Sequence, residues 1–264
     1  PATTRIDPLS LRGAFPIGED RQVPWTEAKS IVQKAYDGFD PRMGKVINTF
    51  LTSPWIDVPP APGKSPGAFA HPTVPSAHPY ILLNYHGRIR DVMTLAHELG
   101  HGVHQVLAAK QGYLMSDTPL TLAETASVFG ETLTFQSLLD GEKDPIRRRL
   151  LLAGKVEDML NTVVRRIAFY EFETRGHDER KKGELLPEQI GAIWRAVQTE
   201  SLGPAFNFTP EYDVFWAYIP HFIHSPFYVY AYAFGDCLVN ALYKVFSEGA
   251  PDFQDKYITM LQAG

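Results

Sequence analysis

Residues 91–104 read DVMTLAHELGHGVH and contain the pentapeptide His97-Glu98-Leu99-Gly100-His101. An α-helix has about 3.6 residues per turn, so residues four apart lie on the same face. His97 and His101 are therefore expected to direct two imidazoles toward one point. A catalytic zinc takes three protein ligands, of which imidazole is a common one, and leaves a fourth position for water. Glu98 lies to the side of this pair, where its carboxylate could accept a proton from a metal-activated water.

The residues around the pentapeptide support a helix over 90–110. Asp91 is predicted to cap its start, and apolar residues recur at helical spacing at Val92, Leu95, Ala96, Leu99, Val103 and Val106. Gly100 and Gly102 are poor helix formers, which indicates that another part of the chain packs very close to them. The alternative is that two core histidines fall at this spacing by chance, because short motifs also give false matches.

A third ligand must come from another part of the chain. The pattern with a further histidine six residues after the second one fails, because Leu107 stands there. The run LTLAETASVFGETLTFQSLL at 120–139 is predicted to form a second helix that returns antiparallel, and its Glu124 is the expected third ligand. Glu131, farther along the same face, could coordinate, could accept a hydrogen bond from a ligating imidazole, or could be an exposed helix carboxylate.

A second group of candidates lies in HFIHSPFYVYAYAFGD at 221–236. A zinc hydrolase must stabilise the oxyanion of its tetrahedral intermediate, and Tyr O–H and His N–H groups can donate to it. Tyrosine is also a normal amphipathic core residue, so packing is the competing interpretation. Function is favoured for His221 and Tyr228, both interpretations stay open for His224 and Tyr232, and packing is favoured for Tyr230.

Elsewhere the patterns predict a mainly α chain with a small sheet. Strands are expected at 67–70 and 80–85, where a sheet edge beside the zinc helix could add a peptide as another strand. Asp40-Pro41 is a cap and first-turn pair for one of the helices. The remaining helices are predicted at 24–38, 41–52, 143–175, 187–201, 226–248 and 251–262.

Composition excludes several classes of protein. The 264 residues carry a net charge of −5, which argues against nucleic acid as a partner. The basic clusters 147–149 and 180–182 are interpreted as solvated helix ends. The single cysteine, Cys237, cannot form an internal disulfide and is expected in the core. Because no apolar run approaches 18 residues and PATTRIDPLS at 1–10 is unlike a signal peptide, no membrane partner and a cytoplasmic location are expected.

Several segments together resemble the thimet oligopeptidase and oligoendopeptidase F family of zinc metallopeptidases, and the oligoendopeptidase F branch more closely. The resemblance covers nearly the whole chain and rests on WID at 55–57, GKSPGAFA at 63–70, PYILLNYHG at 79–87, DVMTLAHELGHGVH at 91–104, LAETASVFGETL at 122–133 and IPHFIHSPFYVYAYAFG at 219–235.

The resemblance implies a multi-helical, zincin-like catalytic domain that cleaves short oligopeptides in a deep channel. One Zn2+ would be held by His97, His101 and Glu124, with Glu98 as general base and His and Tyr donors after residue 220 contacting substrate. Family members are longer, so residues 1–264 are expected to be a single catalytic domain from a longer peptidase, without its amino-terminal helical half and extreme carboxyl terminus.

Two alternatives to a zinc endopeptidase remain. One is a fragment that keeps the zinc and binds peptide without turning it over. The other is a structural zinc site, which is disfavoured because such sites usually have four protein ligands, often including cysteine. The sequence leaves open the oligomeric state and the metal loaded, since cobalt or manganese can replace zinc at such ligands.

Overall fold

The computed structural model describes residues 22–264, so the amino-terminal segment considered above lies outside the described residues. The chain divides into two compact units. The first contains the described residues up to Gly154 together with Leu238–Gly264, and the second is Lys155–Cys237. Helices α5 (Pro145–Met159) and α9 (Tyr230–Ser247) each contribute residues to both units.

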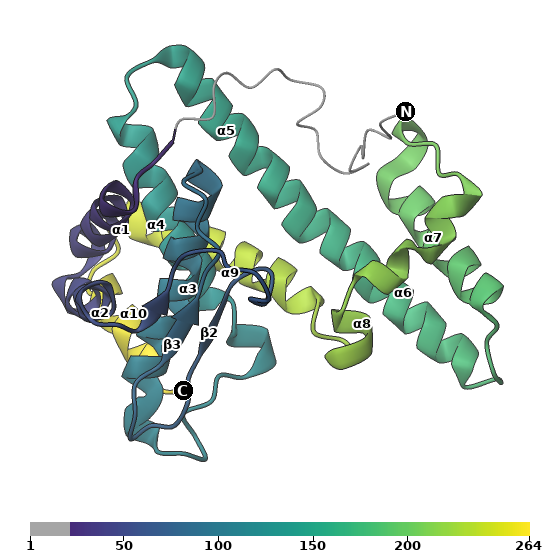
Figure 1. Ribbon diagram of the computed structural model, residues 1–264, viewed down its shortest axis with the longest axis horizontal. Coiled ribbons are helices and arrows are strands. Elements are labelled where there is room, and N and C mark those ends of the chain that lie inside the picture. The colour runs from purple at the N-terminus through teal and green to yellow at the C-terminus, as the bar shows by residue number, and fades with distance from the viewer. Residues whose placement is uncertain (1–21) are drawn as a thin grey trace. The chain divides into compact units, whose positions relative to one another are not determined.

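Helices and a small sheet make up the first unit, as the sequence predicts. Besides its parts of α5 and α9, this unit contains two short 3-10 segments, Ala109–Gln111 and Leu120–Leu122. Its other elements are α1 Trp25–Phe39, α2 Pro41–Thr52, β1 Ile56–Asp57, β2 Phe69–His71, β3 Tyr80–Leu82, α3 Ile89–Ala108, α4 Thr125–Gly141 and α10 Phe253–Gln262. Strands β2 and β3 run beside α3, which carries the histidine pair (Figure 1). The mainly α fold with a sheet beside this helix is therefore confirmed.

The sheet has the strand order β1-β3-β2. Strand β3 pairs in parallel with β1, with Ile56 opposite Ile81, and antiparallel with β2, with Ala70 opposite Ile81. The two predicted strands are thus present, whereas β1 was not predicted from the sequence. Hydrogen bonding continues beyond β3, because the N–H of Leu83 donates to the Asp57 carbonyl at 2.8 Å. Strand β2 is left as an edge strand.

The helix starts in the first unit show which sequence signals were correct. Asp40 caps α2 as predicted, since its Oδ1 accepts the backbone N–H of Arg42 at 2.7 Å. Asp91 caps the start of α3 as predicted, but from inside the first turn, because the helix begins at Ile89 with Arg88 as its N-cap residue. Asp91 lies in the first turn and accepts the backbone N–H groups of His86 and Arg88, each at 2.9 Å. Like the acidic residue of a capping box, Asp91 thus satisfies the backbone N–H of the N-cap residue from three positions further on.

Helix α4 begins later than its sequence pattern suggests. The apolar run 120–139 predicts one continuous helix, but a 3-10 turn at Leu120–Leu122 comes first and α4 starts at Thr125. Glu124 is the residue just before the helix, with φ −90° and ψ 0°, and its carbonyl accepts the N–H of Val128 at 3.0 Å. The carboxylate is therefore placed by a helix start and not by a helix face.

Two glycines let α3 pack closely against its neighbours. A Cβ built on Gly100 would lie 2.4 Å from the carbonyl oxygen of Ala126 in α4, and one on Gly102 would lie 2.7 Å from the ring of Phe50 in α2. Both distances are too short for a side chain, so the prediction that something packs very close to these glycines is confirmed. The contact at Gly100 brings the backbones of α3 and α4 together.

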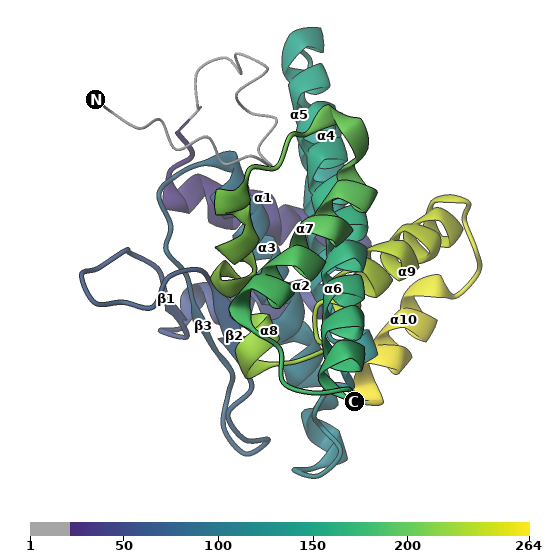
Figure 2. The ribbon, with the colours of Figure 1, turned by 90° about the vertical axis from the view of Figure 1, so that its right-hand side faces the viewer.

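The second unit is built around an aromatic core. Its helices are α6 Arg165–Arg180, α7 Pro187–Leu202 and the short α8 His221–His224, with a π-helical segment Leu160–Val164 and 3-10 segments Gly203–Ala205 and Pro210–Tyr218. Helices α6 and α7 lie side by side (Figure 2). The buried ring of Trp194 on α7 packs against Phe169 and Phe172 of α6, at ring-centroid distances of 5.5 and 5.2 Å.

Three sequence predictions from 143 onward need correction. The helix expected over 143–175 is α5, the π-helical segment and α6, which continues to Arg180. The helix expected from 226 begins at Tyr230, because residues 225–229 form a turn in which Phe227 has φ 61°. Cys237 is exposed and not in the core, since it lies on an outward face of α9. Across residues 22–264, no helix combines the length and apolarity needed to cross a bilayer.

The close packing at Gly100 generates a first prediction. Alanine normally favours a helix over glycine by about 1 kcal/mol, so Gly38→Ala in α1, where a Cβ meets nothing within 4 Å, should raise the free energy of unfolding by up to about that amount. Gly100→Ala should lower it by about 1–3 kcal/mol, because the methyl group forces α3 and α4 apart. Urea unfolding of both variants measures this difference. An equal gain in stability for both would show that the helices are not in close contact.

Candidate metal centre

His97 and His101 lie one turn apart on α3 and face the same point. Their ring centroids are 4.9 Å apart and the rings are nearly perpendicular, at 81°. Oε2 of Glu124 lies 3.3 Å from Nε2 of His97 and 3.5 Å from Nε2 of His101. One candidate ligand atom from each of the three residues thus falls within 4.8 Å of the others. Within residues 22–264 this is the group of three that could hold a metal ion.

The carboxylate of Glu124 is held by its own helix start. Its side chain is buried, with 2% exposed, and Oε2 accepts a hydrogen bond from Oγ of Ser127 at 2.9 Å. The same hydroxyl lies 3.0 Å from the Glu124 carbonyl oxygen. The contact at Gly100 keeps α3 and α4 close together. The carboxylate of Glu124 therefore reaches both imidazoles directly.

Glu131 contacts the other nitrogen of His97. Its Oε1 pairs with Nδ1 of His97, while Nε2 of the same ring faces Glu124. A carboxylate on Nδ1 fixes the ring orientation and favours the tautomer that leaves Nε2 free to bind a metal. Of the three possibilities that the sequence leaves open for Glu131, this geometry favours the hydrogen bond to a ligating imidazole.

The pKa values of the three candidate ligands follow from burial and from one another. Burial and the neighbouring His97 lower the pKa of His101 to about 4. Burial would raise the pKa of Glu124, but the hydrogen bond to His97 and the charges of the two imidazoles outweigh it and lower the value to about 2. Burial would also lower the pKa of His97, yet Glu124 and Glu131 hold it well above its usual value. A metal would therefore find His101 neutral and Glu124 ionised at neutral pH.

Glu98 lies beside this group and is not part of it. Only 5% of the residue is exposed, and within residues 22–264 its Oε2 has no hydrogen-bond partner. Burial raises the pKa of Glu98 to about 7, with the charge of His97 acting in the opposite direction. A backbone hydrogen bond from Ala70 in β2 also lowers it slightly, so the sheet reaches the site. A carboxylate that titrates near neutrality is suited to accept and return a proton.

A second cluster, in the second unit, joins three of the aromatic candidates. Nε2 of His221 lies 3.2 Å from Oη of Tyr232. The ring of Tyr228 lies 5.8 Å from that of His221 and 5.4 Å from that of Tyr232. The guanidinium of Arg166 covers the Tyr232 ring at 4.8 Å. The structure thus brings His221, Tyr228 and Tyr232 together.

The other two candidates of this segment lie outside the cluster. His224 ends α8 with an exposed side chain. Tyr230 packs its ring 5.5 Å from that of Tyr170 on α6, in accordance with the packing interpretation. Helix α8 ends at His224 and α9 starts only at Tyr230. Because a turn separates the two helices, the side chains of this segment do not all lie on one helix face.

Sequence reasoning missed two residues that support these clusters. Ser127 holds Glu124, and its position three residues later at a helix start is a signal that could have identified it. Glu173 on α6 is buried and accepts the backbone N–H of Phe227 at 2.7 Å, next to the turn that carries Tyr228. It is 54 residues from Phe227 along the chain, so no local pattern connects the two.

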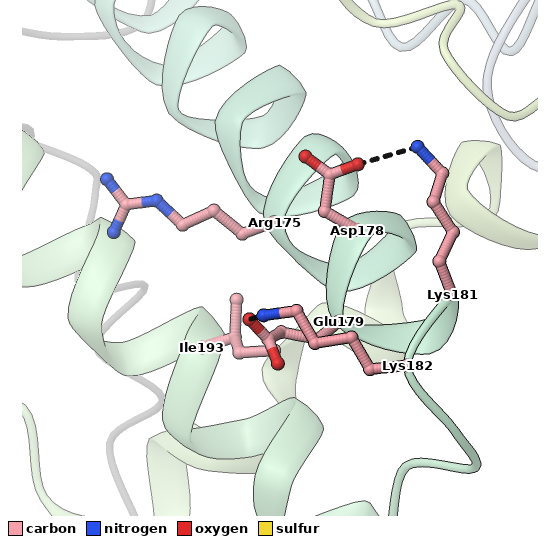
Figure 3. Close-up of a pocket in the computed structure, with 6 residues that line it drawn as sticks. All are labelled: Arg175, Asp178, Glu179, Lys181, Lys182 and Ile193. Atoms are coloured by element: carbon pink, nitrogen blue, oxygen red, sulfur yellow. Dashed lines mark hydrogen bonds and ion pairs between the residues drawn. The ribbon is translucent and has the colours of Figure 1, made fainter.

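A hollow in the second unit contains none of these candidates. It has a volume of about 780 Å3 and is lined by Arg175, Asp178, Glu179, Lys181, Lys182 and Ile193 (Figure 3). Lys181 pairs with Asp178 at 2.8 Å and Lys182 with Glu179 at 2.7 Å, and all four side chains are well exposed. These pairs agree with the interpretation of residues 180–182 as a solvated helix end.

Zinc metallopeptidase centres typically have such a histidine pair on one helix with a glutamate between the two histidines. A third ligand comes from elsewhere in the chain, here a carboxylate at the start of a second helix. The chain belongs to peptidase family M3, whose family model matches residues 32–264. Oligopeptidase PepF of Bacillus subtilis (strain 168) is 32% identical over 246 residues, which are 92% of this chain and 36% of PepF. The plasmid oligoendopeptidase F of Lactococcus lactis subsp. cremoris is 33% identical over 259 residues, 97% of this chain and 42% of that protein.

Solved structures agree with this assignment. The crystal structure of oligoendopeptidase-F from Enterococcus faecium has a TM-score of 0.61 at 25% identity and covers 97% of this chain and 37% of its own. PZ peptidase A with inhibitor 2 shares the fold, with a TM-score of 0.77 at 18% identity over 91% of this chain and 43% of its own. The resemblance to oligoendopeptidase F predicted from the sequence is confirmed. The chain spans less than half the length of these relatives.

The raised pKa of Glu98 predicts how stability depends on pH in the metal-free protein. The folded state keeps the Glu98 proton up to about pH 7, whereas the unfolded state loses it near the ordinary glutamate pKa of 4.5. Stability is therefore lost as pH rises through this window. Glu98→Gln cannot ionise, so its gain in melting temperature over the parent should be larger at pH 8 than at pH 5, in the presence of a chelator.

Thermal unfolding at the two pH values measures this effect. Glu184→Gln, at an exposed position, is the matched control. Its melting temperature should differ from that of the parent by the same amount at pH 5 and at pH 8. An equal shift for Glu98→Gln at both pH values would contradict the burial of an ionisable Glu98.

Proposed function

We propose that this chain carries the catalytic metal centre of an oligopeptidase and binds one Zn2+ per chain through His97, His101 and Glu124. The observation that carries the proposal is the convergence of these three ligand atoms within 4.8 Å, with Glu98 buried beside them. Two imidazoles and one carboxylate suit zinc and leave a coordination position open for catalysis. Residues 1–264 are proposed to be a catalytic portion of a longer peptidase.

The proposed reaction is hydrolysis of a peptide bond by water. Bound zinc would supply Lewis acidity that polarises the scissile carbonyl and favours deprotonation of water. Glu98 would accept the proton of the attacking water and deliver it to the leaving amine, a role consistent with its pKa of about 7. Glu131 would keep Nε2 of His97 directed at the metal through its contact with Nδ1.

We assign stabilisation of the tetrahedral oxyanion to the cluster of the second unit. His221, Tyr228 and Tyr232 offer ring N–H and hydroxyl donors within one contact network. Groups of these two kinds can donate hydrogen bonds to a developing oxyanion. His224 lies outside this network, so it is the weakest of the four candidates.

The proposed substrates are short peptides. Strand β2 is an edge strand, and the backbone of its central residue Ala70 makes a hydrogen bond to the Glu98 carboxylate. An extended peptide added along this edge would place its backbone next to the base. The chain spans less than half the length of its relatives. The alternative is therefore a fragment that binds peptide without cleaving it, and an assay of cleavage distinguishes this from an active peptidase.

Cleavage of a quenched peptide tests the proposal. Activity should require metal, stop with a chelator such as phenanthroline and return on adding Zn2+. Glu98→Gln should still bind zinc but lose activity by about 10²–10⁴-fold, since general acid–base catalysis contributes roughly that factor. His101→Ala should lose stoichiometric zinc in elemental analysis.

Each failure has a separate meaning. Cleavage by Glu98→Gln at the parent rate would reject the base, and full zinc content in His101→Ala would reject the ligand set. Peptide binding by the metal-loaded parent without formation of new amino termini would favour the non-cleaving fragment.

The contact between Glu131 and His97 generates a further prediction. Glu131→Gln should weaken zinc binding by about 10–100-fold, as is typical when a partner of a ligating histidine is changed. Competition with a chromophoric chelator measures this affinity. Glu142→Gln, beyond the end of α4, is the control and should bind zinc like the parent. Unchanged affinity in Glu131→Gln would show that the contact does not support the ligand.

A further inference from the structure

Tyr36 joins α1 to the helix that carries the histidine pair. The residue is completely buried, and its hydroxyl donates to the carbonyl oxygen of Ala96 at 2.8 Å. A carbonyl inside a helix also accepts the backbone N–H four residues later. The bond from Tyr36 is therefore additional to those that form α3, and it ties α3 to α1 at one point.

The same hydroxyl also fills a gap in α4. A Cβ built on Gly130 would lie 1.7 Å from the Tyr36 hydroxyl oxygen and 2.9 Å from the Ala96 oxygen. The hydroxyl thus occupies the place where other residues would have a side chain. Its position is fixed by α3 and α4 together, so neither helix can shift there without displacing it.

The Tyr36 hydroxyl lies against the residues that directly precede His97 and Glu131 in the sequence. Ala96 comes just before His97 and Gly130 just before Glu131, and His97 Nδ1 pairs with Glu131. Burial, with the charge of Glu131 as a second cause, raises the pKa of the Tyr36 hydroxyl above its usual value. The hydroxyl therefore keeps its proton and remains a donor to Ala96 at any physiological pH.

We infer that Tyr36 is a positioning residue of the metal centre, whose hydroxyl sets the spacing of α3 and α4 at the point where His97 meets Glu131. This inference rests on the proposed metal site at His97, His101 and Glu124. Tyr36 does not contact the ligand atoms. It acts through the backbone that carries His97 and Glu131, and so determines how Nε2 of His97 is directed.

The same core contains a matched control. Tyr257 on α10 is also buried, with 3% exposed, and its ring stacks on Phe129 with centroids 4.4 Å apart. Its hydroxyl has no hydrogen-bond partner within residues 22–264. Tyr36→Phe and Tyr257→Phe therefore remove the same atom from the same core, and only the first removes a bond to α3.

The test measures metal binding at a temperature where circular dichroism shows every variant to be folded. Tyr36→Phe should weaken zinc binding by about 3–10-fold, below the effect of a direct partner of the ligand. It should also change the visible absorption of the Co2+-loaded protein, which reports ligand geometry. Tyr257→Phe should leave the zinc affinity within about twofold of the parent and the cobalt spectrum unchanged.

A double-mutant cycle tests the route of the effect. If Tyr36 acts through the His97–Glu131 contact, Tyr36→Phe should have a smaller effect on zinc affinity in a Glu131→Gln background than in the parent. Gly130→Ala offers a second variant, because its methyl group takes the place of the hydroxyl, and it should weaken zinc binding in the same way.

The outcomes separate this inference from the metal site itself. The positioning role would be overturned if Tyr36→Phe and Tyr257→Phe had the same zinc affinity and cobalt spectrum. Additive effects of Tyr36→Phe and Glu131→Gln in the cycle would also overturn it. In both cases the proposed metal site would stand as long as His101→Ala loses metal. Unfolding of both Tyr36→Phe and Gly130→Ala would make Tyr36 a residue of the fold only. Zinc bound equally by the parent and His101→Ala would reject the proposed site, and the inference with it.

Discussion

The contact between the backbones of α3 and α4 at Gly100 is the constraint on which the metal centre depends. With 2.4 Å between the position of a Cβ at residue 100 and the Ala126 oxygen, only glycine permits this approach. The approach brings Glu124 to the histidine pair and Glu131 to the far side of His97. Gly130 repeats the arrangement on α4, where the missing side chain is replaced by the Tyr36 hydroxyl. Close packing of helices, and not the histidine spacing alone, therefore assembles the candidate ligand set.

The centre concentrates ionisable groups that a core would normally exclude. Glu98 and Glu124 are both nearly inaccessible to water, yet burial raises the pKa of one to about 7 while hydrogen bonding lowers that of the other to about 2. Glu124 has the two imidazoles and Ser127 as partners, whereas Oε2 of Glu98 has none within residues 22–264. Two neighbouring carboxylates with opposite shifts are the physical basis for giving one the role of ligand and the other that of base.

Local signals predicted most of the helices and part of their capping. The Asp40-Pro41 pair marked the start of α2, and the apolar spacing of 92–106 marked α3. The errors fall where tertiary contacts override local preference. Strand β1 has two residues and exists only because β3 pairs with it, and the exposure of Cys237 depends on how α9 is turned. The turn at Phe227 is held by Glu173 from a distant helix, so the start of α9 could not be read from its apolar run.

The sequence by itself determined the family, the identity of the histidine pair with its adjacent glutamate, and a glutamate at 124 as the third candidate ligand. The histidine pair and its glutamate follow from residue types at fixed local spacings, which a helix converts directly into geometry. The family follows from several matching segments, and Glu124 from the acidic residue of a second predicted helix. Only the tertiary structure decided that Glu124 stands at a helix start, that Glu131 faces Nδ1 of His97, and that Tyr36 fills the space at Gly130. Such contacts depend on the separation and rotation of two packed helices, which side chains distant in the chain set together.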